Sequence, residues 1–359
     1  MTQLPYQFEQ PLPPIPHDRR TGLIVFGIFA LVIGGLAACS AIFTPLMLLM
    51  ASAMQPGAGA PAAGGGTIMV HGSQPDPRSI PSAVMLYVVV AAAFIAGGVG
   101  SIRTRRWARP LMLSVGWTWL LVGVFGMVIL AALLPSMQEM MAPSAGAGPG
   151  PPAMPAGFTS ALMWITGAIS FVMYIVLPGI FLFFYSSRHV RATLEHYDPA
   201  PGWADRAPVS VFTLAVALAV SGLFTLAMVT YGMFPLFGTM LTGPAAMGAT
   251  VATAGVFLLA AYLVYRLRMS GWWLTMLISV VLPLAMIVSM QRLGIIAMYE
   301  HMGLPPEQIE AVRDNDLIRG PLIPIATAVM GVFGVVYLFA VRKFFVASAG
   351  SERSVTSVS

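Results

Sequence analysis

Residues 103–134 read RTRRWARPLMLSVGWTWLLVGVFGMVILAALL: four arginines come first, and no charged residue follows between positions 110 and 134. A helix needs about 20 mostly apolar residues to cross the hydrocarbon core of a bilayer, which is about 30 Å thick. The stretch therefore predicts a basic turn at a membrane surface, followed by a transmembrane helix.

Seven other apolar runs of similar length occur in the chain, and none of the eight holds an Asp, Glu, Lys, Arg or His well inside it. The expected spans are 22–50, 82–102, 110–134, 160–185, 209–234, 244–265, 271–290 and 321–341. Of the 359 residues, 58% are hydrophobic and 9% charged, whereas soluble domains carry about 25% charged residues. We therefore expect an all-α, polytopic membrane protein with about eight transmembrane helices.

The basic residues predict the orientation of these spans. One side of the membrane receives 14 of the 18: Arg19, Arg20, Arg103, Arg105, Arg106, Arg109, Arg188, Arg191, Arg206, Arg266, Arg268, Arg342, Lys343 and Arg353. The positive-inside rule puts this side and both termini in the cytoplasm. The net charge of +5 is then explained by topology, and we expect no nucleic-acid partner. Frequent arginine and alanine favour a bacterial source, and so a bacterial cytoplasmic (inner) membrane.

The chain divides into five expected segments. A cytoplasmic, Pro-rich N-terminal segment covers 1–21, a first four-span half 22–185, a cytoplasmic linker 186–208 and a second four-span half 209–341. The Ser-rich tail, 342–359, is expected to be disordered and cytoplasmic.

The two halves show a local similarity. The segment 103–113 resembles 266–277 when one gap is allowed, and two spans precede each segment within its half. Since both halves have the same predicted orientation, a duplication would give two parallel four-helix repeats. The alternative remains open, because basic inside loops and interfacial tryptophans are common in unrelated membrane proteins.

The basic turn is also a candidate binding site. Arg103, Arg105, Arg106 and Arg109 form the densest positive cluster of the sequence, and juxtamembrane basic clusters attract anionic lipid headgroups. Membrane lipids are therefore the expected partners, although the same arginines would be needed for topology alone.

Methionines gather outside the third and seventh spans. Thioether sulfur favours Cu(I), so weak copper candidates are Met137, Met140, Met141, Met298, His301 and Met302. The chain holds 25 methionines in all, and methionine is also an ordinary apolar filler. With Cys39 as the single cysteine, no intrachain disulfide is possible. We expect no cofactor.

Small residues recur at four-residue spacing within three of the spans. They are Ala30, Gly34 and Ala38; Ala92, Ala96 and Gly100; and Ala245, Ala249 and Thr253. Such stripes let helix backbones approach closely in lipid. Packing within the chain is one interpretation, and contact with a second copy or another membrane protein is the other.

No catalytic motif stands out, and no carboxylate pair lies within a span. Our first hypothesis is a non-enzymatic structural or accessory component of the membrane. The second is a transporter or channel for a small uncharged or lipophilic solute, since charged coupling residues are missing from the spans. The third is a lipid-modifying enzyme with its chemistry in an outer loop, at Glu300, His301, Glu307 and Glu310.

Overall fold

The computed structural model describes residues 18–53, 80–141, 156–301, 309–310, 313 and 320–356. Eight helical segments in this part of the chain are long and apolar enough to cross a membrane. They are α1 (Arg20–Ala53), α2 (Ile80–Ile102), α3 (Ala108–Met141), α4 (Ala156–Phe171) continued by α5 (Leu177–Ser186), α7 (Val209–Ala227), α8 (Gly243–Tyr265), α9 (Met269–Leu293) and α13 (Leu322–Thr356). The predicted class and the count of eight spans are confirmed.

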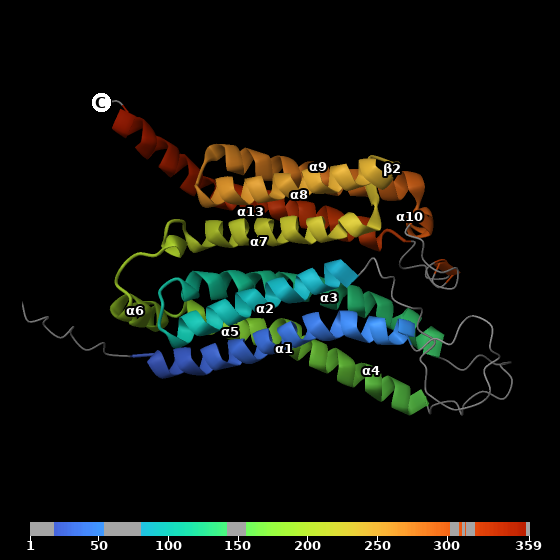
Figure 1. Cartoon of the computed structure of the whole chain (residues 1–359), viewed down its shortest axis with the longest axis horizontal. Helices are drawn as coiled ribbons and strands as arrows, with labels where there is room; N and C mark the ends of the chain where they lie inside the picture. Colours follow the sequence, from blue (N-terminus) through green and yellow to red (C-terminus); the bar gives the residue numbers. More distant parts are fainter. Residues whose placement is uncertain are drawn as a thin grey trace, which may run out of the picture.

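The spans run roughly along one axis, and the two halves of the chain lie side by side (Figure 1). In the first half α1 packs on α2, α2 on α3 and α3 on α5; in the second half α7 packs on α8, α8 on α9 and α9 on α13. The halves meet where α7 contacts α2 and α3. Short turns between antiparallel neighbours produce such pairing in any bundle, so the duplication stays a prediction.

Glycines set the closest approach between α1 and α2. A Cβ atom added at Gly98 would lie 2.8 Å from the Gly27 carbonyl oxygen, and one added at Gly34 would lie 3.2 Å from the Ala91 carbonyl oxygen. Ala30 is fully buried beside them. This small-residue stripe therefore packs within the chain, as one of the two interpretations expected, while self-association through other faces stays a prediction.

A π-helical turn, Val172–Val176, separates α4 from α5. Pro178 has no backbone N–H to donate to Tyr174 four residues earlier, and the Leu177 N–H bonds instead to the Val172 carbonyl, five residues back. Gly123 of α3 faces the Tyr174 carbonyl, where a side chain would collide with it. On the N-terminal side of this turn, α4 diverges from α3 (Figure 1).

The fifth apolar run ends earlier than predicted. The helix stops at Ala227 and a 3₁₀ turn, Met228–Tyr231, follows. Gly232 then takes a positive φ of 61°, and β1 (Met233–Leu236) pairs antiparallel with β2 (Thr239–Thr242). Phe237 and Gly238 both have positive φ, as a two-residue hairpin turn requires. No strand was predicted here, because the expected fifth span continued to residue 234.

The linker contains a separate helix, α6 (Arg188–Tyr197), at the end of the bundle (Figure 1). The fourth span ends close to the predicted residue 185, because the backbone turns extended at Ser187, with ψ of 137°, and the Ser187 hydroxyl accepts a hydrogen bond from the His189 N–H. Val190 and Leu194 are buried. α6 therefore packs its apolar side against the ends of the spans.

The last helix, α13, continues to Thr356. The tail 342–359 was expected to be disordered, but residues 342–356 are helical. Alanine, glutamate and arginine in this segment favour helix, and an established helix extends at little cost.

The two Arg-x-Arg turns share one backbone conformation. Thr104 and Leu267 are left-handed, with φ of 50° and 53°. Arg105 N–H bonds to the Gly100 carbonyl, and Arg268 N–H bonds to the Leu263 carbonyl, five residues back in both cases. A left-handed residue followed by such a hydrogen bond ends a helix at its C-terminus. Residues 103–105 and 266–268 therefore correspond one to one, without a gap. This correspondence adds to the local similarity of the halves.

Candidate functional site at the arginine end

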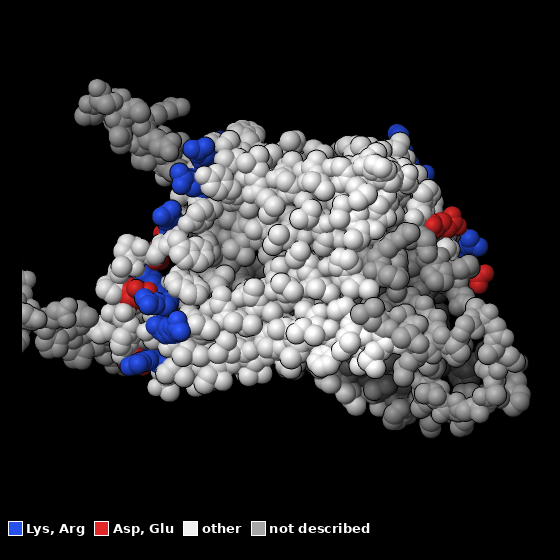
Figure 2. Space-filling view, viewed as in Figure 1, with Lys and Arg blue, Asp and Glu red and all other residues white. Residues whose placement is uncertain are grey.

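Most described arginines lie at one end of the bundle (Figure 2). We call this the arginine end; it comprises the start of α1, the α2–α3 turn, α6, the linker before α7, the α8–α9 turn and the basic part of α13. The long sides of the visible face are almost free of charge. This distribution matches a body embedded in hydrocarbon between two aqueous ends.

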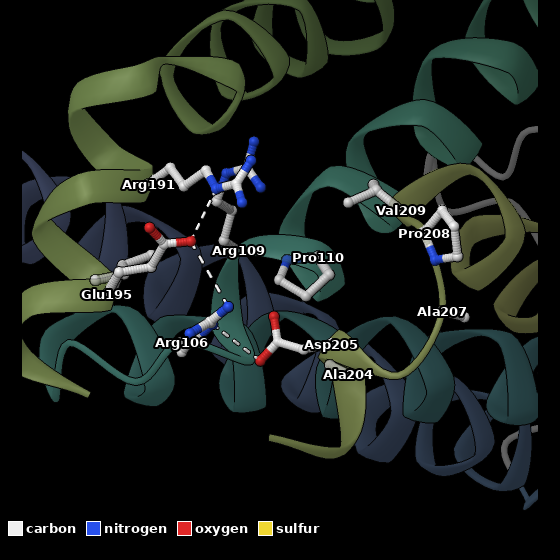
Figure 3. A pocket seen from close by; sticks show the side chains of 11 residues that line it. Arg106, Arg109, Pro110, Arg191, Glu195, Ala204, Asp205, Ala207, Pro208 and Val209 are labelled. Carbon is white, nitrogen blue, oxygen red and sulfur yellow. Dashed lines mark hydrogen bonds and ion pairs between the residues drawn. The ribbon is translucent and has the colours of Figure 1, made fainter. Parts of the chain in front are cut away.

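Arg106 lies at the centre of an ion-pair network. Its Nε is 3.1 Å from Asp205 Oδ2, and a terminal nitrogen is 3.6 Å from Glu195 Oε1 (Figure 3). Its backbone N–H donates to Asp198 Oδ2 at 3.1 Å. Because the three carboxylates come from α6 and the linker, Arg106 ties that segment to the α2–α3 turn.

Two further arginines complete this network. Arg191 Nε donates to Glu195 Oε1 at 2.8 Å, and this bond raises the pKa of Arg191 above its ordinary value. Arg109 Nε donates to the Tyr185 carbonyl at the end of α5, at 3.0 Å. The Tyr185 hydroxyl is in turn 2.7 Å from Ser101 Oγ of α2. The side chains thus join α2, α3, α5 and α6.

A pocket of about 280 Å³ lies among these groups. Arg106, Arg109 and Arg191 line it together with Glu195 and Asp205, so positive side chains exceed negative ones by one. Figure 3 shows the three arginines converging from the α2–α3 turn, α3 and α6. An anionic group of small size is the ligand that this lining would accept.

The linker also contacts the second half through aromatic side chains. The Trp203 ring stacks against Trp107, with centroids 6.3 Å apart, and packs on Phe212 of α7. The Tyr265 hydroxyl, at the end of α8, donates to the Trp203 carbonyl at 2.9 Å. One residue of the linker therefore touches both halves.

The predicted lipid-headgroup residues divide into two groups. Arg106 and Arg109 line the pocket, whereas Arg103 is exposed and Arg105 lies 3.9 Å from Asp198. Headgroup binding stays a prediction for all four. Sequence reasoning did not find Glu195, Asp198 and Asp205, although three carboxylates in a linker beside four arginines on the same predicted side were a usable signal.

The copper and enzyme candidates are placed only in part. Met298 is buried in α10 (Ile295–His301), and the His301 Nδ1 lies 2.7 Å from the Ala297 carbonyl oxygen. The side chains of Met137, Met140 and Met141, and the residues Met302 and Glu307, lie outside what the structure describes. Glu300 is 4.0 Å from Arg313, and Glu310 is exposed. Both assignments stay predictions.

Comparison with protein-family models, with curated proteins and with solved structures finds no match for this chain. The fold by itself defines the class: a multi-pass α-helical membrane protein.

Proposed function

We propose that the protein is a non-enzymatic structural or accessory component of the bacterial cytoplasmic membrane. Its arginine end faces the cytoplasm, and its two halves are held together at that end as one rigid body. The orientation follows from the excess of arginine in the turns at one end of the bundle.

The observation that carries this proposal is the ion-pair network around Arg106. Its guanidinium bonds carboxylates of α6 and the linker, and the linker contacts α7 and α8 through Trp203. A catalytic or transport site needs polar groups left available for a substrate. Here the three carboxylates pair with arginines of the same chain, which favours a structural role.

Polar side chains inside the spans support the same proposal. The Thr250 hydroxyl donates to the Ala246 carbonyl, and the Thr275 hydroxyl donates to the Gly271 carbonyl, each one turn back on its own helix. A hydroxyl satisfied in this way needs neither water nor solute in the membrane interior. Both hydroxyls therefore stay bonded to their own helices.

Distance measurements between the halves test this proposal. In a Cys39→Ser background, spin labels at Arg188 and Arg342 report the arginine end, and labels at Met50 and Thr239 report the opposite end. We expect one narrow distance distribution for each pair in lipid nanodiscs. Two populations with opposite shifts at the two ends would show alternating access and overturn the rigid arrangement.

The orientation has its own test. Cysteine placed at Arg292 should react with a membrane-impermeant maleimide in intact cells, whereas cysteine at Arg103 should react only after permeabilisation. Labelling of both positions from outside would contradict the proposed topology.

A transporter for an uncharged solute is the second candidate, and one observation favours it. Ser114 of α3 and Thr213 of α7 bring their hydroxyl oxygens within 2.9 Å of each other across the contact between the halves. One turn deeper on α3, the buried Thr118 hydroxyl has no hydrogen-bond partner among the described groups. Because residues four apart share a helix face, hydroxyls follow the α3 side of this contact, as a path for a neutral solute would require.

A further inference from the structure

A second pocket, of about 260 Å³, lies at the arginine end of the second half. Arg206 from the linker lines it, together with Tyr265, Arg266, Leu267 and Arg268 from the α8–α9 turn. None of these residues belongs to the Arg106 network, and none was singled out as a binding residue from the sequence.

The charge around this pocket is not neutralised within the described structure. The carboxylates described at the arginine end contact other groups: Glu195, Asp198 and Asp205 pair with arginines of the α2–α3 turn and α6, and Asp18 accepts from the Tyr197 hydroxyl. Among the described side chains, no carboxylate lies within 4.0 Å of Arg206, Arg266 or Arg268. Three exposed arginines thus line one open pocket without a counter-charge from these carboxylates.

Backbone contacts fix the α8–α9 turn that carries Arg266 and Arg268. Leu267 is left-handed, and the bonds from Leu267 N–H to the Val264 carbonyl and from Arg268 N–H to the Leu263 carbonyl close the end of α8. A Cβ atom added at Gly271 would lie 2.7 Å from Leu263 and Val264 backbone atoms, so α9 begins in tight contact with α8. The α8–α9 turn is therefore closely packed rather than loose.

Arg206 is positioned by a different contact. The Tyr265 hydroxyl donates to the Trp203 carbonyl at 2.9 Å, which fixes the linker three residues before Arg206 over the end of α8. The Arg266 guanidinium lies 6.0 Å from the centre of the Tyr262 ring of α8. The linker and the turn thus bring three arginines to the pocket from two separate segments.

We propose that this second-half pocket binds a phosphate-bearing anion. Guanidinium groups match phosphate oxygens with paired hydrogen bonds, and basic groups at a bilayer surface attract anionic phospholipids. The ligand is the phosphate of a lipid headgroup or a free phosphate ion, since both present the same oxygens. The proposal is independent of the structural role of the Arg106 network.

The test uses the full chain purified in detergent, with phosphatidylglycerol and inorganic phosphate as separate probes. Retained lipid is counted by native mass spectrometry, and phosphate binding is followed by calorimetry. The site variant is Arg266→Gln/Arg268→Gln. The matched control is Arg19→Gln/Arg188→Gln, which removes the same charge from exposed positions at the same end, outside both pockets.

We expect the site variant to bind one of the probes roughly thirtyfold more weakly than the wild type, from the loss of two basic contacts, while the control stays within about twofold of it. Loss of phosphatidylglycerol alone identifies a lipid headgroup, and loss of inorganic phosphate binding identifies a free ion. Equal weakening in the site variant and the control would show diffuse charge attraction and overturn the proposal. Unchanged binding of both probes in the site variant, or no binding by the wild type, would overturn it as well.

Discussion

Arg106→Gln offers the most direct test of the network that joins α3 to the linker. The substitution removes the bond from Nε to Asp205 Oδ2, 3.1 Å long between side chains that are 23% and 22% exposed, and the weaker 3.6 Å pair with Glu195. A hydrogen bond to a charged group contributes about 1.5–3 kcal/mol, and a pair of the longer kind less than about 1 kcal/mol. We expect the free energy of unfolding to fall by about 2–3 kcal/mol.

The assay is reversible unfolding of the full chain in mixed detergent micelles, with Asp205→Asn and the double variant completing a cycle. Asp205 keeps its bond from the Gly202 N–H in the Arg106 variant, so the two single changes should not add. We expect a coupling energy of about 1–2 kcal/mol. Arg188→Gln, exposed and outside the network, is the control and should change stability by less than about 0.5 kcal/mol.

Additive effects of the two substitutions would refute this reasoning, because they would show that the Arg106–Asp205 contact carries no energy of its own. A loss in Arg188→Gln as large as that in Arg106→Gln would refute it too, since net charge rather than geometry would then set stability.

Two other contacts make predictions by the same unfolding assay. Gly98→Ala places a methyl group within 3 Å of α1 and should lower the free energy of unfolding by about 1–3 kcal/mol. The control Gly35→Ala meets no atom within 4 Å and should leave stability unchanged or raise it. Equal effects of the two substitutions would contradict the close α1–α2 approach. Trp272→Phe removes the hydrogen bond from Nε1 to the Leu338 carbonyl of α13 and should lower the free energy of unfolding by about 1–3 kcal/mol. The control Trp273→Phe, at a 60% exposed position, should lower it by less than about 0.5 kcal/mol. A larger loss for Trp273→Phe than for Trp272→Phe would show that this hydrogen bond does not hold α13 against α9.

The spans were predictable because each is an apolar run of bilayer length, and hydrocarbon imposes that pattern on the sequence directly. The hairpin Met233–Thr242 was not, because its residues are as apolar as the helix before it. Gly232 and Gly238 were the residues that could have indicated turns, but hydropathy alone does not detect turns.

The position of the arginine turn at a membrane surface was predicted, but the ion pairs that its arginines form were not. Arg106 and Asp205 are 99 positions apart in the sequence, and periodicity carries no information about contacts at that separation. From the sequence, we predicted that four arginines lie at one surface, without any distinction among them. The structure distinguishes them, because the carboxylates of α6 and the linker reach Arg105 and Arg106, while Arg103 stays exposed.

The divergence of α4 from α3 beyond the π-helical turn gives the first half unequal cross-sections in the two leaflets. It is broader at the end away from the arginines (Figure 1), with Trp164 on α4 80% exposed. A wedge of this kind displaces more lipid from one leaflet than from the other, and a flat bilayer must stretch or thin around it. Bending the membrane relieves that mismatch, so the protein should partition between small and large vesicles according to their radius.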